Sequence, residues 1–451
     1  MNLLLLIALA AGGQEMSAIE PGALEGRPPI AETSPLQARV DAAAPGARID
    51  VERGEYAGDL VLERPVTLVG HGRPRLLGSG KGSVVRVRAP GVTLEGFDID
   101  GRGGGSIDRD FSGIHVAAAD FVVRDCRIIG ALFGVYLRAA DGARVDHCEI
   151  HGIPGRDDGE KGSGIHIWNT RGFELTGNVI DRSRDGLYIQ SSSGGKMRGN
   201  VVRNVRYGLH FMYSDDNTFE ENVFADSAAG GVLMYSRRLT LRRNQFLHNR
   251  GFASVGLLCQ SCEDSVAEDN VLLDNARGLF LEGSRRNVFR RNLIADSDAA
   301  IVLFDSCADN RFEDNAFLGN LSPLTLVGRR TDTSFDGNFW SDNERPDLDG
   351  DGRSDGEYVL SSLFDHLRGN LLAADLMVRS PAAVALAAAE RTFPVLEAVK
   401  AVDHRPLSRL PDLSRLPVVH TRARSRSLPG MAAGLGLIAF GAAVLTRGRR
   451  G

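Results

Sequence analysis

An imidazole and two thioethers recur at a regular interval near the middle of the chain. His210 and Met212 are two residues apart, and Met234 follows Met212 by 22 residues. Side chains two apart in a β-strand point to the same face. Thioether sulfur and imidazole nitrogen suit Cu(I) better than Zn²⁺ or Ca²⁺. Methionine is also a common filler of apolar surface, so a transient Cu(I) site at these three residues is a hypothesis.

A second group of candidate ligands is acidic. Its carboxylates occupy the first, third, fifth and ninth positions of a calcium loop: Asp347, Asp349, Asp351 and Asp355. Gly352 stands at the tight turn, but Tyr358 replaces the glutamate that would close the loop. The pattern predicts a structural Ca²⁺, and the alternative is an acidic turn without a metal.

An asparagine column indicates the element that must position these residues. Eight asparagines recur in the same context at intervals close to 22 residues, each followed two residues later by an apolar side chain: Asn178, Asn200, Asn222, Asn244, Asn270, Asn292, Asn315 and Asn338. Upstream, Cys148 and Cys126 occupy the corresponding positions. A charged insert at Pro154 to Lys161 lengthens the interval between Cys148 and Asn178. Short strands joined by Gly, Asn and Asp turns favour an all-β fold, a right-handed parallel β-helix with coils of about 22 residues.

A glycine column fixes which strand residues face outward. Its members open short strands such as GIHIW and GLHFM and include Gly164, Gly186, Gly208 and Gly230. Residues one and three after each glycine are mostly aliphatic and face the core, so residues two and four face away. The predicted outer face therefore carries polar and aromatic side chains at His115, Tyr136, His166, Trp168 and Tyr188, besides His210, Met212 and Met234.

Three interpretations of this outer face remain open. It is a binding face, or it is covered by a loop or helix of the same chain. In the third, the protein is a polysaccharide lyase, hydrolase or epimerase in which Tyr136, Trp168 and Tyr188 stack on sugar rings. Asp215 or Asp216 would then act with His210 in acid/base catalysis. The few carboxylates of the face argue against this enzyme.

The five cysteines predict little chemistry. Cys126 and Cys148 are expected to be buried members of the asparagine column, or alternatively a disulfide. Cys259 and Cys262 form a C-x-x-C pair without the βαβ context of a redox motif. Cys262 and Cys307 lie about two coils apart, and the alternative for these two is a soft-metal patch.

The chain ends predict export and anchoring. An apolar N-terminus resembles a secretory signal, and PGMAAGLGLIAFGAAVLT followed by arginines resembles a transmembrane anchor that leaves the body outside the cytoplasm. The alternative for this C-terminal segment is a sorting signal that is later cleaved. Short helices at Pro35 to Gly46 and Leu371 to Val399 are expected to cap the two coil ends. The predicted organisation is a signal peptide (1–17), a β-helix (35–345), an acidic loop with a helical cap (346–408), a linker (409–428) and a C-terminal membrane anchor (429–451).

Charge excludes one class of partner. The formal net charge is −5, with 53 basic and 58 acidic residues, and basic segments are only local. The sequence thus lacks the basic surface of a nucleic-acid-binding protein.

Three segments of the sequence resemble one known protein family. The segment DGLYIQSSSGGKMRGNVVRNVRYGLHFMYSDDNTFEENVF resembles the NosD family of periplasmic copper-processing proteins. The segments NFWSDN…DLDGDGRSDGEY and RSPAAVALAAAERTFPVL, followed by Asp403 to Leu407, are also similar to that family. The resemblance covers roughly Pro35 to Leu407.

The resemblance implies a maturation factor, not an enzyme. Proteins of this family work with an ABC-type permease and its ATPase and with a copper-chaperone lipoprotein, and together these deliver copper to nitrous oxide reductase. The implied location is periplasmic, at the cytoplasmic membrane. From the strand GLHFMYS the resemblance singles out His210, Met212 and Tyr213, and Met234 comes from the next coil. Which of them are ligands stays open.

Overall fold

The computed structural model describes residues 35–419 except 106–108, 252, 329–330, 361–379, 382–384 and 386–400. The chain divides into two units, Met1–Pro417 and Val418–Gly451, and of the second only Val418 and Val419 are described. The predicted signal peptide and membrane anchor, and almost all of the predicted C-terminal cap, lie outside the described residues. Within the described part, no helix combines the length and the apolar character needed to cross a membrane.

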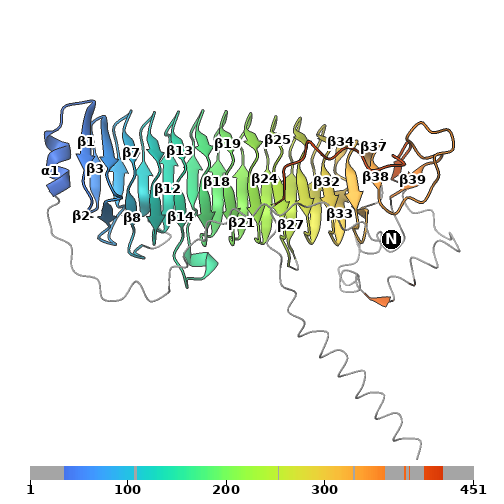
Figure 1. Ribbon diagram of the computed structural model, residues 1–451, viewed down its shortest axis with the longest axis horizontal. Helices are drawn as coiled ribbons and strands as arrows, with labels where there is room; N and C mark the ends of the chain where they lie inside the picture. Colours follow the sequence, from blue (N-terminus) through green and yellow to red (C-terminus); the bar gives the residue numbers. More distant parts are fainter. Residues whose placement is uncertain are drawn as a thin grey trace, which may run out of the picture. The chain divides into compact units, whose positions relative to one another are not determined.

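The first unit is a right-handed parallel β-helix of about 13 turns, which confirms the predicted fold class. The chain visits three sheets in turn, so each coil contributes one strand to each sheet, and the coils stack along one axis (Figure 1). Within the three sheets every pairing is parallel except β39 with β40.

The sheets are named here A, B and C in the order in which the chain enters them. Sheet A runs β1 (Ala47–Val51), β4 (Val66–Gly70), β7 (Thr93–Glu95), β10 (Val122–Arg124), β13 (Arg144–Asp146), β16 (Glu174–Thr176), β19 (Lys196–Arg198), β22 (Thr218–Glu220), β25 (Thr240–Arg242), β28 (Val266–Glu268), β31 (Val288–Arg290), β34 (Ala308–Glu313), β37 (Asp332–Asp336), β40 (Val402–Asp403) and β39 (Tyr358–Val359). Sheet B runs β2 (Glu55–Ala57), β5 (Arg75–Leu77), β8 (Asp98–Asp100), β11 (Arg127–Ile129), β14 (Glu149–His151), β17 (Val179–Asp181), β20 (Val201–Arg203), β23 (Val223–Ala225), β26 (Gln245–Leu247), β29 (Val271–Leu273), β32 (Leu293–Ala295), β35 (Ala316–Leu318) and β38 (Phe339–Trp340). Sheet C, which carries the outer face predicted above, runs β3 (Leu60–Leu62), β6 (Val85–Val87), β9 (Ser112–Val116), β12 (Phe133–Arg138), β15 (Ile165–Trp168), β18 (Asp185–Gln190), β21 (Tyr207–Met212), β24 (Ala229–Met234), β27 (Val255–Gln260), β30 (Arg277–Glu282), β33 (Ala299–Phe304) and β36 (Leu324–Val327).

The asparagine column forms a continuous ladder at the turn from sheet A to sheet B. From Asn178 to Asn315, the backbone N–H and the side-chain Nδ2 of each asparagine both donate to Oδ1 of the asparagine on the next coil, at 2.9–3.1 Å. The residue before each of these asparagines has a positive φ, which produces the turn. The ladder satisfies buried polar groups that would otherwise destabilise the fold.

One coil is longer than the rest of this series. Asn244 bonds to Asn270, which lies 26 residues further along the chain, while most steps of the ladder span 22 or 23. Asn244 and Asn270 keep the same hydrogen bonds despite the four additional residues. The extra residues are therefore accommodated between strands β26 and β27 without breaking the stack.

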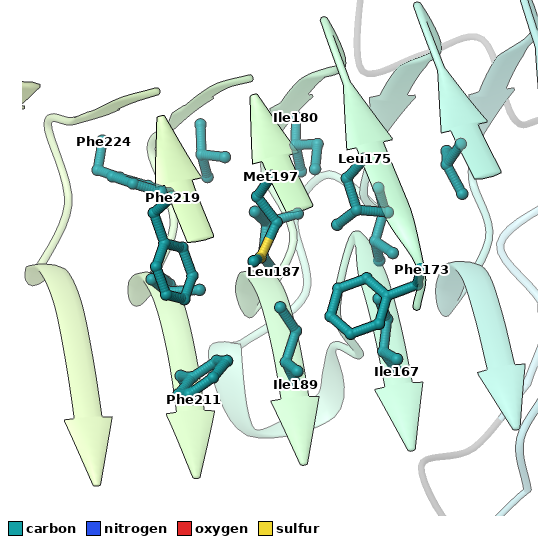
Figure 2. Packing of buried hydrophobic residues seen from close by; sticks show 14 of the residues in the cluster. Ile167, Phe173, Leu175, Ile180, Leu187, Ile189, Met197, Phe211, Phe219 and Phe224 are labelled. Atoms are coloured by element: carbon teal, nitrogen blue, oxygen red, sulfur yellow. The ribbon is translucent and has the colours of Figure 1, made fainter. Parts of the chain in front are cut away.

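Apolar side chains from all three sheets fill the interior. Figure 2 shows Phe173, Leu175, Met197 and Phe219 from the sheet A side, Ile180 and Phe224 from sheet B, and Ile167, Leu187, Ile189 and Phe211 from sheet C. An isolated coil would expose these apolar side chains to water, so stacking the coils creates the core.

The glycine column results from close packing between coils. A Cβ atom on Gly208 would lie 2.5 Å from the carbonyl oxygen of Gly230 and 2.9 Å from Cδ1 of Phe224. No side chain fits at that separation, which explains why glycine recurs near the start of the sheet C strands.

Different elements close the two ends of the coil stack. The short helix α1 (Pro35–Ala42) buries Leu36 and Val40 against the core at the N-terminal end, as predicted (Figure 1). At the other end, Asp403 is fully buried and accepts hydrogen bonds from Gly337 N, Asn338 N, Asn338 Nδ2 and Trp340 Nε1. Its carboxylate takes the place that a further asparagine would occupy and ends the ladder.

Candidate functional site

Five rings form a column along the outer face of sheet C, and four of them stack. His115, Tyr136, His166, Tyr188 and His210 occupy the same register position on consecutive coils. The first four rings are parallel, with centroids 4.3–5.2 Å apart and interplanar angles of 6–14°. The ring of His210 instead meets Tyr188 edge-on, at 4.8 Å and 83°. The alternating His and Tyr residues predicted as an outer stripe are thus brought together, and His210 is turned out of the stack.

The N-terminal part of the stack is covered. Tyr136 is only 6% exposed because Leu132 and Phe133 pack against it, and Phe133 also meets His166 edge-on at 5.3 Å. The expectation that the whole stripe is an open binding face therefore does not hold at Tyr136. Trp168, at the strand end, is exposed, with the guanidinium of Arg138 4.9 Å from the centroid of its ring.

Burial favours the neutral form of the four parallel rings. It lowers the pKa of His115, and it lowers the pKa of His166 to about 4, where the nearby charge of Asp185 opposes the shift and His210 adds to it. Burial also raises the pKa of Tyr136 and Tyr188. Neutral imidazoles retain a lone pair for a metal or a hydrogen bond.

His210 is hydrogen-bonded to the ion pair of Asp185 and Arg206. Its Nδ1 lies 3.0 Å from Oδ2 of Asp185, and Arg206 donates to the same carboxylate at 2.9 and 2.7 Å. Burial works against ionisation of Asp185, but the hydrogen bonds from His210 and Arg206 keep its pKa below the usual value. The carboxylate is therefore charged and holds one ring nitrogen of His210.

The two methionines are direct neighbours. Met212 and Met234 pair in register on β21 and β24, and Met212 shares its strand and face with His210. Met234 also packs against a small apolar cluster of Ala229, Val232 and Val255 that is separate from the core. The structure thus places the three residues of the Cu(I) hypothesis on two adjacent coils, on the same side of sheet C.

Two exposed tyrosines follow the methionines. Tyr213 and Tyr235 are 57% and 45% exposed, both have a positive φ, and their rings stack at 5.0 Å and 8°. Tyr213 therefore belongs to the turn after β21 and lies beside the stripe. Tyr235, its partner, was not singled out from the sequence, although the repeated string MYS marks both.

The alternative of a sugar-processing enzyme gains no support from this geometry. Sugar rings stack on aromatic faces, but of the three candidate aromatic residues only Trp168 is exposed, because Tyr136 and Tyr188 pack against neighbouring rings. The candidate acids Asp215 and Asp216 are bound by Arg237 and Arg238, and the hydrogen bond from Arg238 lowers the pKa of Asp216.

Three of the four predicted calcium ligands come together. One carboxylate oxygen from each of Asp347, Asp349 and Asp351 lies within 4.8 Å of the others. Asp355 is not in that group, and its carboxylate accepts a hydrogen bond from Leu348 N. Hydrogen bonds, chiefly from Ser408, hold the pKa of Asp347 below its usual value against the opposing effect of burial.

Calcium is expected to raise the thermal unfolding temperature of the wild-type chain, because a ligand that binds only the folded state stabilises it, by about 2.7 kcal/mol at 100 times Kd. Asp347→Asn/Asp351→Asn should abolish this rise in differential scanning fluorimetry. Asp412→Asn, which removes an acidic residue elsewhere, is the matched control. An equal rise in all three chains would show that Ca²⁺ does not bind this loop.

All five cysteines are buried free thiols. Cys126 and Cys148 continue the ladder as predicted: Cys148 N donates to Asn178 Oδ1 at 2.9 Å. The neighbouring Cys126 thiol and burial raise the pKa of Cys148, and Cys262 and burial do the same for Cys259. Burial also raises the pKa of Cys307, and a protonated buried thiol is a poor metal ligand, so the structure does not favour the soft-metal patch at Cys262 and Cys307.

Comparison with known proteins extends the resemblance. Residues 149–345 match the family model described as "Periplasmic copper-binding protein (NosD)". These coils are thus similar to the NosD family. The match includes His166, Trp168, Tyr188, His210, Met212, Tyr213 and Met234, whereas His115, Tyr136 and the acidic loop lie outside it.

Two relatives bear the same name, "Probable ABC transporter binding protein NosD". The protein of Pseudomonas aeruginosa is 34% identical over 140 residues, which cover 31% of this chain and 32% of the relative. The protein of Stutzerimonas stutzeri is 30% identical over 165 residues, which cover 36% and 37%. The chain thus spans about a third of the length of the curated relatives it matches.

Solved structures share the fold. The A-module of the mannuronan C-5 epimerase AlgE6 of Azotobacter vinelandii has a TM-score of 0.53 and 16% identity, over 66% of this chain and 93% of that module. A PL6 alginate lyase in complex with a trisaccharide has a TM-score of 0.52 and 14% identity, over 67% and 81%. At such identities the likeness concerns the β-helix and not the activity.

Sequence reasoning missed the ion pair that holds His210. The positions that match Asp185 on the two adjacent coils carry the uncharged residues Ser163 and Tyr207, so the charge at the start of this sheet C strand was the available signal. The contact itself depends on the rotation of the His210 ring, which no spacing rule supplies.

Proposed function

We propose that this protein is a periplasmic maturation factor that binds Cu(I) transiently and passes it on for assembly of nitrous oxide reductase. The observation that carries the proposal is the juxtaposition of His210, Met212 and Met234 on one face of two adjacent coils. Imidazole and thioether donors match Cu(I), and the family that the central coils match is described as copper-binding.

The proposed partners follow from the names of the relatives. Because two relatives are named ABC transporter binding proteins, we propose that the chain works beside an ABC-type permease and its ATPase. A copper-chaperone lipoprotein would donate the metal, and nitrous oxide reductase would receive it. Residues 429–451 would attach the chain to the cytoplasmic membrane. In this role the protein holds and transfers an ion and catalyses no reaction.

Anaerobic competition titration with a Cu(I) chelator tests the proposal. The full-length wild-type chain should bind one Cu(I), and His210→Ala/Met212→Leu/Met234→Leu should weaken binding by at least about 100-fold, because all three soft or borderline donors are lost. His248→Ala/Met197→Leu, which removes one imidazole and one thioether elsewhere, is the matched control and should bind as the wild type does. No binding by the wild-type chain, or equal binding by all variants, would contradict a copper site on sheet C.

A further inference from the structure

The orientation of one ring separates His210 from the other members of the stack. The rings of His115, Tyr136, His166 and Tyr188 lie parallel, within 14° of their neighbours. The ring of His210 is nearly perpendicular to both Tyr188 and Tyr207, at 83° and 87°. Continuing the stack would have been the simplest packing, so a specific contact must turn this ring.

Asp185 supplies that contact. It lies at the start of β18, one coil before His210, and its carboxylate accepts a hydrogen bond from Nδ1 of His210 at 3.0 Å. The Asp185 side chain is only 3% exposed and that of His210 only 12%. Phe133, which stands in the same relation to His166, offers no acceptor, and the buried Nδ1 of His166 has no hydrogen-bond partner among the described residues.

Arg206 fixes the carboxylate in turn. Its guanidinium bonds both oxygens of Asp185, at 2.9 and 2.7 Å, and lies 4.3 Å from the centroid of the Tyr207 ring. A planar guanidinium held in this way orients the carboxylate plane. Asp185, held by Arg206, and the rings of Tyr188 and Tyr207 therefore all contact the imidazole of His210.

We propose that Asp185 is the positioning residue of the copper site: it turns His210 out of the ring stack and keeps hydrogen on Nδ1. Because a carboxylate only accepts hydrogen bonds, Nδ1 must be the donor, and Nε2 then keeps its lone pair in the neutral ring. Nε2 is left as the single atom of His210 that can bind a metal beside Met212 and Met234. Such partners of ligand histidines typically contribute 10- to 100-fold to metal affinity. The role of Asp185 in Cu(I) binding rests on the proposed function, whereas its effect on the tautomer of His210 does not.

Asp185→Asn tests this role. The amide can donate to Nδ1, which favours the tautomer with hydrogen on Nε2 and blocks the ligand atom. We expect Cu(I) affinity to fall about 10- to 100-fold in anaerobic competition titration. Asp185→Glu should recover part of the loss, because it restores a carboxylate. Circular dichroism and thermal unfolding will identify a variant that is merely misfolded.

Asp181→Asn is the matched control. Asp181 also binds a histidine and an arginine, His151 at 2.6 Å and Arg182 at 3.0 Å, but it lies on sheet B. This variant should bind Cu(I) as the wild-type chain does.

The tautomer of His210 can be measured in the metal-free chain. In ¹⁵N NMR of the metal-free chain, His210 should carry hydrogen on Nδ1 in the wild type and shift toward Nε2–H in Asp185→Asn. An unchanged tautomer together with unchanged affinity would overturn the positioning role. If Asp185→Asn changes the tautomer but the wild-type chain binds no Cu(I), the proposed function is refuted, whereas Asp185 still positions His210.

Discussion

Replacing Asp403 by alanine is expected to destabilise the C-terminal coils by at least about 4 kcal/mol, since four buried donors lose their acceptor at once and each costs about 1–3 kcal/mol. These donors are Gly337 N, Asn338 N, Asn338 Nδ2 and Trp340 Nε1. A solenoid is stabilised by contacts between neighbouring coils. The damage should therefore begin at the last coils and appear as faster amide exchange in β35 and β38 than in β11 and β14.

Two variants show whether the effect comes from the buried acceptor. Asp403→Asn keeps one carbonyl oxygen and should lose less stability in chemical denaturation than Asp403→Ala. Asp336→Ala removes a carboxylate from the same end of the molecule, but its ion pair with Arg405 is exposed and should contribute less than about 1 kcal/mol. If Asp403→Ala unfolds within about 0.5 kcal/mol of the wild type, the ladder does not depend on a buried end group.

The repeat could be predicted because its physical cause lies in the sequence interval. Each asparagine must meet the next one coil later, so a spacing near 22 residues recurs from Asn178 to Asn338. The same interval placed Met212 beside Met234, and the structure pairs them in register. Alternation within the strands also identified the outward residues of sheet C.

Contacts between distant segments could not be predicted in the same way. Asp403 reaches Asn338 across 65 residues of chain, and no repeat links the two positions. The burial of Tyr136 depends on how Leu132 and Phe133 pack over it. Sequence spacing does not predict side-chain orientation either. His166 and His210 occupy the same column, yet only His210 is turned out of the stack by a carboxylate.

Protonation of His166 in the ring stack makes the stability of the fold depend on pH. Because burial lowers the pKa of His166 to about 4, the unfolded chain, with an ordinary value near 6.5, binds the proton more tightly. Protonation between these two values therefore favours unfolding. The stability that the neutral ring contributes is complete above about pH 6.5 and is lost as pH falls toward 4.

His166→Phe should remove this loss. Phenylalanine keeps a ring between Tyr136 and Tyr188, whose centroids lie 4.4 and 4.3 Å from that of His166, and it eliminates the buried Nδ1 that has no partner among the described residues. The variant should be at least as stable as the wild type at pH 7.5, because an unsatisfied buried nitrogen is lost.

Between pH 7.5 and 4.5, the wild-type free energy of unfolding should fall by about 2.5 kcal/mol more than that of His166→Phe. Other groups titrate in this range, but they are common to both chains, so the difference isolates His166. Urea denaturation at several pH values measures it, with His71→Phe as the control for removing an exposed imidazole. Parallel pH profiles for the wild type and His166→Phe would mean that the ring is solvated and that the stack is open to water. A difference of the expected size would instead indicate that the stack excludes water around His166.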